Sequence, residues 1–172
     1  MTLLRQGLLD GRAVALAGGV PPAIRDALGA LGALDVRVDA SPINALVYDA
    51  GPAFAAGGQD PLRECIEQAW VAVREAAAGA LIPAGAAKVV LIGPRPDAGP
   101  FAEAARAALE NLARTLSVEW ARYGVGTVAI APGGGTTDEE IAELVCFLVS
   151  PAGEYFTGCA FELGAAPLIR SS

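Results

Sequence analysis

The sequence predicts an α/β protein: a doubly wound, Rossmann-like parallel sheet of about six strands with helices on both faces. Short apolar runs alternate with helical patterns along the chain, and most of these runs are apolar throughout, as in strands buried on both faces. The right-handed crossover rule then favours a doubly wound sheet. With 172 residues and no visible linker or internal repeat, residues 1–172 form one predicted domain.

The first strand is expected in RAVALA, residues 12–17, which is a short apolar run. The first helix is expected in PPAIRDALGALGA, residues 21–33, because Ile24, Leu28 and Leu31 fall on one face at helical spacing. Its two leading prolines suit a helix start, since the first turn tolerates proline. The start of the chain therefore predicts a strand, a glycine turn and a helix.

The next segment, LDVRVDA at 34–40, alternates apolar and polar residues and predicts a second strand. NALVYDAG at 44–51 predicts a buried third strand, and PAFAAGGQ at 52–59 predicts a loop. A long helix is expected over 60–81. Asp60 is its predicted N-cap, which puts the following proline at the first helical position.

The second half continues the alternation. KVVLIGP (88–94) predicts a buried strand, and the longest helix is expected over 101–125. TVAIAPGGG (127–135) predicts a strand followed by a glycine loop. A Thr-x-x-Glu capping signature opens the last helix, 136–150, and CAFELGA (159–165) predicts the last strand.

The composition excludes several classes of function. The net charge is −7, and Lys88 is the only lysine among scattered arginines, so no basic stripe is present for nucleic-acid binding. The absence of histidine excludes Ser-His-Asp and Cys-His catalysis and any histidine-ligated metal. Hydrophobic residues make up 53% of the chain and charged residues 18%, which favours an apolar surface reserved for a partner.

Targeting and redox signals are weak. No apolar run of about 18 residues exists, so no membrane span is predicted. The first residues, MTLLRQGLLDGR, lack the apolar core of a signal peptide, which predicts a cytoplasmic protein. Cys65, Cys146 and Cys159 lie far apart without metal-type spacing and are expected as buried apolar side chains.

Four stretches together resemble the short-chain dehydrogenase/reductase family. RAVALAGG with AIRDALGALGA resembles its first strand, glycine loop and first helix, and ALVYDAG resembles its Asn-Asn-Ala-Gly strand end. ARAALENLARTLSVEWARYGVGTVAIAPG resembles the active-site helix, the next strand and the Pro-Gly turn. DEEIAELVCFLVSPAGEYFTGCAFELGA resembles the C-terminal helix, the Thr-Gly turn and the last strand. The resemblance covers nearly the whole chain and implies a Rossmann-like fold.

The chain departs from the family where the family binds its dinucleotide. The family's first loop reads Thr-Gly-x-x-x-Gly-x-Gly, but here Gly18 and Gly19 lead directly to Val-Pro, and Pro21 and Pro22 have no N–H to offer a phosphate. The family's third strand and its helix have no counterpart. Asp39, near the place of the family's ribose-reading residue, is expected in a short surface loop.

The catalytic residues that the resemblance implies are also missing. The family's Tyr-x-x-x-Lys pair aligns with Ala102 and Arg106, and no tyrosine of the chain has a lysine four residues later. The place of the family's serine reads Gly93-Pro94, and the glycines after Pro132 run into the last helix without a substrate-covering segment. The sequence therefore predicts no catalytic, cofactor-binding or metal-binding residue, and no cofactor.

The leading hypothesis is a non-catalytic subunit that pairs with a full-length, active short-chain dehydrogenase in a hetero-oligomer, expected to be a heterotetramer. The resemblance supports it, since the family assembles through its two long helices and its C-terminal helix and strand. The family includes heteromeric enzymes of acyl-CoA and aromatic degradation, so acyl-CoA and hydroxy or keto compounds are the substrates expected for the complex. The candidate interface residues are Trp70, Val73, Ala77, Phe101, Ala104, Ala108 and Thr115.

Two alternatives stay open at this point. One is an NAD(P)-dependent oxidoreductase with a reworked site, in which Arg106, Asp49 and Arg95 converge at the strand ends, where open α/β sheets bind ligands. The other is a homo-oligomer that holds an acyl or nucleotide ligand without turnover. The candidate interface residues also have a simpler interpretation, which is packing within the chain itself.

Overall fold

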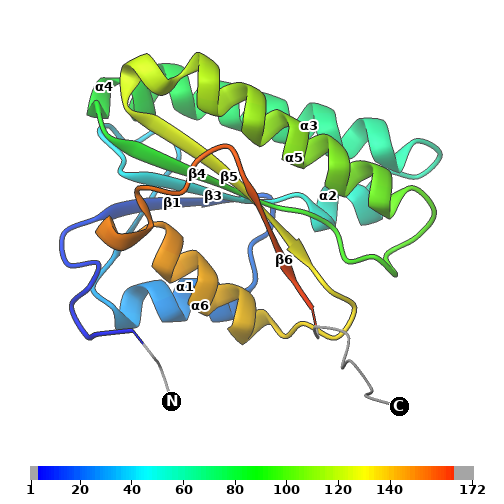
Figure 1. The fold of residues 1–172 in the computed structure, drawn as a ribbon, viewed down its shortest axis with the longest axis horizontal. Helices are drawn as coiled ribbons and strands as arrows, with labels where there is room; N and C mark the ends of the chain where they lie inside the picture. The colour runs from blue at the N-terminus through cyan, green and yellow to red at the C-terminus, as the bar shows by residue number, and fades with distance from the viewer. Residues whose placement is uncertain (1–3, 165–172) are drawn as a thin grey trace, which may run out of the picture.

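The computed structural model describes residues 4–164 and contains a six-stranded, all-parallel sheet (Figure 1). The strand order is β2-β1-β3-β4-β5-β6. The strands are β1 (Ala13–Ala17), β2 (Leu34–Val36), β3 (Ala45–Asp49), β4 (Ala87–Ile92), β5 (Val125–Pro132) and β6 (Ala160–Leu163). The predicted Rossmann-like α/β fold is confirmed, and β3 and β4, in the middle of the sheet, are buried along their whole length.

Two helices cover each face of the sheet (Figure 1). On one face lie α1 (Pro22–Ala30) and α6 (Asp138–Leu148), and on the other lie α3 (Pro61–Ala76) and α5 (Ala102–Glu119). The sheet separates two hydrophobic cores, because alternate side chains of each central strand point to opposite faces. No described helix is long and apolar enough to cross a membrane.

The loop expected over 52–59 is wrong in its first half, where the chain forms α2 (Gly51–Ala56). Pro52 occupies the first turn, the Phe54 N–H donates to the Ala50 carbonyl at 3.0 Å, and the Phe54 ring packs into the core beneath α3. A helix of about one and a half turns is too short to show a helical period in the sequence. Burial of Phe54 therefore decides the conformation of this segment.

The long helices begin close to their predicted starts but end differently. The Asp60 carboxylate accepts from the Arg63 N–H at 3.1 Å, which confirms the predicted N-cap of α3. The helix expected to 81 changes at residue 77 into a π-helical turn, η1 (Ala77–Leu81), followed by the short α4 (Ile82–Ala84). The helix expected to 125 ends at 119 and continues as a 3₁₀ turn, η2 (Ala121–Tyr123).

The capping signature of the last helix is confirmed. The Thr137 hydroxyl accepts from the Glu140 N–H at 3.2 Å, and the Glu140 carboxylate accepts from the Thr137 N–H at 2.8 Å. These paired bonds satisfy two donors at the start of α6. The turn before it is short, because the Thr136 hydroxyl accepts from the Gly133 N–H at 2.9 Å.

The sheet ends at β2, which pairs with only three residues of β1. The strand predicted over 34–40 is therefore too long, and residues 37–44 reach β3 through turns without a helix. Asp39 lies in this connection, 67% exposed and paired with Arg37 at 2.6 Å, which lowers the pKa of the Asp39 carboxyl. This agrees with its expectation as a surface residue.

Candidate functional site

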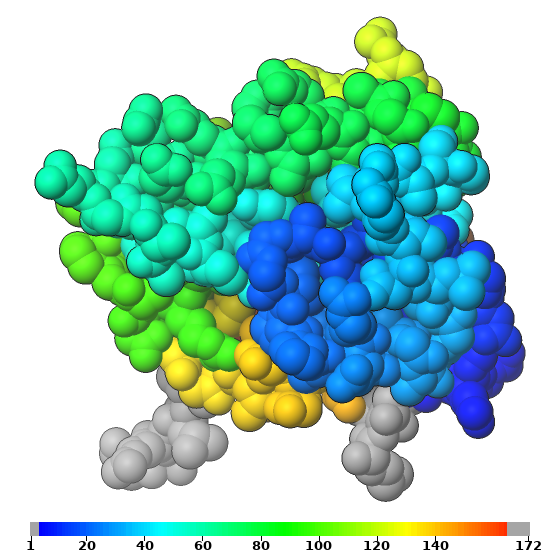
Figure 2. Space-filling view, turned by 180° about the vertical axis from the view of Figure 1, so that it is seen from behind, coloured from blue at the N-terminus to red at the C-terminus, as the bar shows by residue number. Residues whose placement is uncertain are grey.

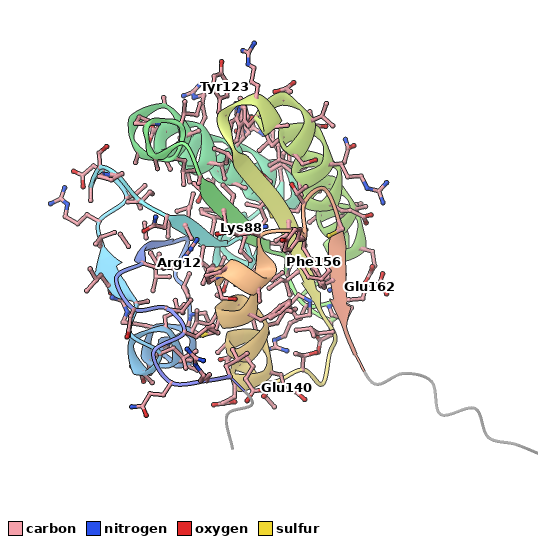
Figure 3. All side chains as sticks on the ribbon, turned by 60° about the vertical axis from the view of Figure 1, so that its left-hand side comes forward. Arg12, Lys88, Tyr123, Glu140, Phe156 and Glu162 are labelled. Atoms are coloured by element: carbon pink, nitrogen blue, oxygen red, sulfur yellow. The ribbon has the colours of Figure 1, made fainter. Side chains whose placement is uncertain are left out.

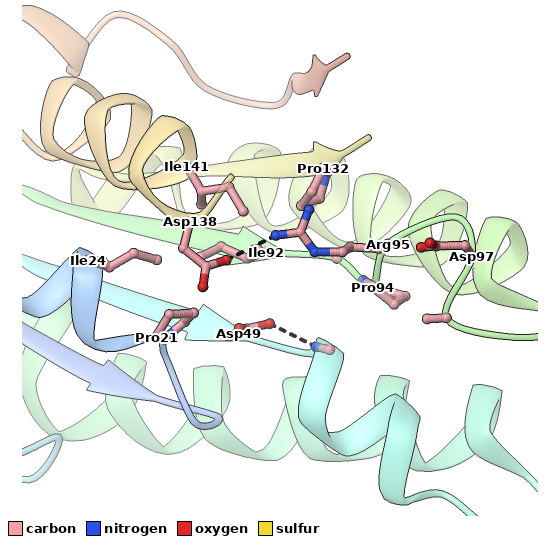
Figure 4. A pocket seen from close by; sticks show the side chains of 13 residues that line it. Pro21, Ile24, Asp49, Ile92, Pro94, Arg95, Asp97, Pro132, Asp138 and Ile141 are labelled. Atoms are coloured by element: carbon pink, nitrogen blue, oxygen red, sulfur yellow. Dashed lines mark hydrogen bonds and ion pairs between the residues drawn. The ribbon is translucent and has the colours of Figure 1, made fainter. Parts of the chain in front are cut away.

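A cavity of about 320 Å³ opens at the carboxyl ends of β3, β4 and β5, between the first turns of α1 and α6 (Figure 4). We call it the edge cavity. Its polar lining includes Asp49, Arg95 and Asp138, and its apolar lining includes three isoleucines. Ligands of open α/β sheets bind at this edge of the sheet. The edge cavity is therefore the candidate ligand site of this chain.

Asp49 ends β3, and its side chain lies in the edge cavity (Figure 4). The residue is 9% exposed, and its Oδ1 accepts from the Gly51 N–H at 2.8 Å. Burial raises the pKa of the Asp49 carboxyl to about 6, with a smaller contribution from the negative charge of Asp138; the Gly51 N–H and Arg95 act in the opposite direction. Asp49 therefore titrates close to neutral pH.

The Arg95 guanidinium is used within the chain. Its Nη2 donates to Asp138 Oδ1 at 3.0 Å, and its Nη1 donates to the carbonyls of Gly133 and Thr136. These bonds join the loop after β4 to the turn before α6. Arg95 thus closes one wall of the edge cavity rather than offering its charge to a ligand.

Arg106 stands at the position of the family's lysine, but it lies on α5, across the sheet from α1 and α6, and it does not line the edge cavity. Its Nη1 donates to the carbonyls of Pro94 and Pro132, and its Nε lies 3.4 Å from Glu103. All three residues therefore lie at the strand ends, as predicted, but only Asp49 and Arg95 line the edge cavity, because α5 brings Arg106 in from the other face of the sheet.

The start of α1 offers few amides to a phosphate. Pro21 and Pro22 have no N–H, and the Ile24 N–H donates to the Pro21 carbonyl at 3.1 Å. Pro21 is the residue before the first turn of α1 and Pro22 lies within that turn, as predicted. Gly18 is retained, but its role is packing, because a Cβ there would lie 2.1 Å from the Asp49 carbonyl oxygen.

We expect Asp49→Asn to raise the free energy of unfolding by about 2 kcal/mol at pH 8. The folded pKa of about 6 lies above the value for an unfolded aspartate, so ionisation of Asp49 between roughly pH 4 and 6 disfavours the native state. Asparagine keeps an acceptor for the Gly51 N–H but does not ionise. Urea unfolding at pH 4.5 and 8 checks this; a gain of equal size at both values would contradict it.

The structure divides the candidate interface residues into two groups. Val73 and Ala77 are 0% and 2% exposed and lie in the core beneath α3, so their assignment to an interface is wrong. Around the helix Val73 lies only about 60° from Trp70, so the predicted stripe exists, but it faces the sheet and leaves Trp70 at its exposed edge. Trp70 is 38% exposed and Phe101 is 63% exposed. Ala104 and Thr115 are exposed and Ala108 is half-buried.

We call the remaining candidates on and beside α3 and α5, with two further exposed valines, the helix surface; its residues are Trp70, Val71, Phe101, Ala104, Ala108, Thr115 and Val118. Val71 and Val118 are 41% and 78% exposed and were not predicted, although Val71 directly follows Trp70. Seen from behind, the segment of α3 runs along the upper margin of the molecule (Figure 2). Contact of the helix surface with a partner stays a prediction.

A second exposed apolar group lies beside β6 and was not predicted. The rings of Phe147, Phe156 and Phe161 form a chain with centroids 5.7 and 5.5 Å apart. Phe156 is 39% exposed and the neighbouring Tyr155 is 91% exposed. We call these four residues the aromatic surface. Their spacing in the sequence carries no periodic signal, because a helix, a loop and a strand each contribute.

Lys88 supports the aromatic surface from within (Figure 3). Its side chain is buried, and its Nζ donates to the carbonyls of Gly153 at 3.0 Å, Glu154 at 3.5 Å and Phe156. Burial lowers the pKa of Lys88, while Cys159 and Glu154 favour its charged form. The only lysine of the chain is thus bound to the loop before β6.

The comparisons with known proteins agree with the fold. The chain is 29% identical over 162 residues to gluconate 5-dehydrogenase of Gluconobacter oxydans, covering 82% of this chain and 62% of that enzyme, less than two thirds of its length. Among solved structures, a citronellol catabolism dehydrogenase of Pseudomonas aeruginosa superposes with a TM-score of 0.75 at 20% identity, covering 94% of this chain and 97% of that one.

A hydroxysteroid dehydrogenase of Escherichia coli superposes with a TM-score of 0.69 at 15% identity, covering 93% of this chain and 98% of that one. No family model matches the sequence. The solved structures support the fold, and the curated relative extends the likeness to the sequence. The chain therefore has a Rossmann-like fold and is similar, in fold and in sequence, to short-chain dehydrogenases/reductases.

Proposed function

We propose that the protein is a non-catalytic, short-chain dehydrogenase-like subunit that pairs with an active, full-length short-chain dehydrogenase. The observation that carries the proposal is the replacement of the family's tyrosine-lysine pair. Ala102 is buried and has no proton to transfer, and Arg106 binds the carbonyl ends of β4 and β5. A side chain that binds two backbone carbonyls is not placed to do what the family's lysine does, which is to lower the pKa of the catalytic tyrosine, and here that tyrosine is absent.

The dinucleotide-binding features are replaced in the same way. The first turn of α1 contains two prolines, and Arg95 fills the space between the loops after β4 and β5 with its own hydrogen bonds. At both places the groups present hold this chain together, and neither offers the backbone donors that a dinucleotide's phosphates use. The retained fold therefore supports an assembly role more than turnover.

Two apolar surfaces are available for assembly. The helix surface presents Trp70 and Phe101 beside small side chains, and small side chains allow another helix to approach closely. Phe101 adopts a left-handed backbone conformation with φ of 72°, which is strained for a non-glycine residue. An exposed aromatic ring held in a strained conformation supports a binding role for this surface.

We expect Ala104→Arg to weaken pairing at least tenfold while the chain stays folded. Ala104 is an exposed residue of the helix surface, and a buried, unpaired arginine at an interface costs several kcal/mol. Ala30→Arg is the matched control, because Ala30 is an exposed alanine at the end of α1, on the opposite face of the sheet. Co-purification with a tagged reductase from the same organism, followed by light scattering, measures the complex.

The proposed partner acts on a hydroxy, keto or acyl-CoA compound, as expected from the resemblance, and its activity is measured with and without this chain. A hetero-oligomer that forms with the wild type and with Ala30→Arg, but not with Ala104→Arg, supports the proposal. A monodisperse monomer that leaves the reductase activity unchanged contradicts it. A homo-oligomer of the isolated chain would favour the ligand-holding alternative instead.

The reworked-enzyme alternative keeps one supporting observation, which is the raised pKa of a carboxyl in the edge cavity. Asp49 is a group able to exchange a proton near neutral pH. Calorimetric titration of the isolated chain with NADH and NADPH separates the two hypotheses. Micromolar binding of either dinucleotide would favour an NAD(P)-dependent oxidoreductase, whereas no binding favours the non-catalytic subunit.

A further inference from the structure

We propose that the edge cavity binds a small organic cation, a primary ammonium carried on an apolar group, with Asp49 as the acceptor of the ammonium. The proposal does not depend on pairing with a reductase. It rests on the charge of the lining, on a buried carboxylate oxygen that faces the cavity, and on the apolar walls around it.

The lining has an excess of negative charge. Three carboxylates, those of Asp49, Asp97 and Asp138, line the edge cavity together with one guanidinium, that of Arg95. Arg95 already forms an ion pair with Asp138 at 3.0 Å and donates to two carbonyls. The balance disfavours the phosphates of a dinucleotide and favours a positively charged ligand.

Asp49 is placed to receive that charge. Within residues 4–164, the hydrogen bonds of its carboxylate reach only Oδ1, which accepts from the Gly51 N–H. Figure 4 shows the Asp49 carboxylate beside Pro21 and below the side chain of Asp138. A carboxylate that is 9% exposed loses most of its hydration, and an ammonium restores charge-assisted hydrogen bonds to the second oxygen.

The remaining walls fit an apolar group. Ile24, Ile92 and Ile141 come from α1, β4 and α6, and three prolines and an alanine add to the apolar lining. The volume of about 320 Å³ is at the lower end of the range for small-molecule sites, so the ligand is small. Within the described residues, no group of three acidic, cysteine or histidine side chains is placed to hold a metal ion, which points to an organic cation.

Calorimetric titration of the full chain with benzylamine tests the proposal, with benzyl alcohol and benzoate as neutral and anionic probes of the same shape. We expect benzylamine to bind at least tenfold more tightly than either at pH 7.5. Benzylamine stays protonated at pH 5, whereas Asp49, whose pKa is about 6, becomes neutral, so its affinity falls at the lower pH.

Two variants locate the site. Asp49→Asn is expected to lower the affinity for benzylamine at least tenfold, and its thermal unfolding confirms that the chain is folded. Asp35 lies on β2, outside the edge cavity, and pairs with Arg25 of α1. Asp35→Asn removes this carboxylate and is expected to leave the affinity for benzylamine unchanged. Equal binding of the three probes, no effect of Asp49→Asn, or no benzylamine binding at millimolar concentration would each overturn the proposal.

Discussion

Gly18→Ala is expected to lower the free energy of unfolding by about 4 kcal/mol, although the substitution adds only one methyl group. Gly18 follows β1 with φ of 80°, a conformation that costs an L-residue about 1–2 kcal/mol. The added Cβ would lie 2.1 Å from the Asp49 carbonyl oxygen and 2.9 Å from its carbon. Both are backbone atoms of a central strand and cannot move aside.

Gly29→Ala is the control. Gly29 lies within α1, and a Cβ there meets nothing within 4 Å, so the substitution is expected to stabilise the chain by up to about 1 kcal/mol. Chemical unfolding of both variants measures the difference. A Gly18→Ala variant within about 1 kcal/mol of the wild type would contradict the close approach of β1 to the end of β3.

The stability of Gly18→Ala also tests why a glycine is present in the first loop. In the family that the sequence resembles, the loop glycines let the backbone approach a pyrophosphate. In this chain Gly18 is required by contact with β3, whether or not a ligand is present. A large loss of stability would mean that the retained glycine is explained by packing and gives no support to dinucleotide binding.

Lys88→Met is expected to lower the free energy of unfolding by about 3 kcal/mol. Methionine keeps most of the apolar stem but has no ammonium, so the carbonyls of Glu154 and Phe156 lose this donor, and the Gly153 carbonyl keeps only the Phe156 N–H. Each buried acceptor left without a donor costs about 1–3 kcal/mol, and removal of a buried charge recovers part of that cost.

Arg114→Met is the control for Lys88→Met. Arg114 pairs with Glu110 at 2.6 Å on the exposed side of α5, and such a pair contributes about 0.5 kcal/mol or less. Thermal and urea unfolding of both variants give the comparison. Equal effects of the two substitutions would show that the Lys88 hydrogen bonds add no more than a surface ion pair.

Lys88→Met also tests the order of the aromatic surface. The loop that Lys88 binds carries Phe156, whose ring lies between those of Phe147 and Phe161. Release of this loop is expected to increase hydrogen exchange at residues 153–158 more than in the helices. Uniform exchange across the chain would place the effect of Lys88 in global stability alone.

The sequence by itself determined the α/β class, the alternation of strands and helices, and the two caps at Asp60 and Thr137. These features depend on residues within one or two turns of each other, so they can be recognised in the sequence alone. The absence of histidine and of a tyrosine-lysine spacing also needs no structure, because residue types that are missing cannot be supplied by folding.

Only the tertiary structure decided which side chains meet. It placed Asp49 and Arg95 in one cavity and Arg106 on the other face of the sheet, and it buried Val73, which a helical stripe alone assigned to a surface. Lys88 shows the reason most clearly. Its three acceptors lie more than sixty residues away in the chain, so their positions depend on how β4 and β6 are ordered in the sheet rather than on any local pattern.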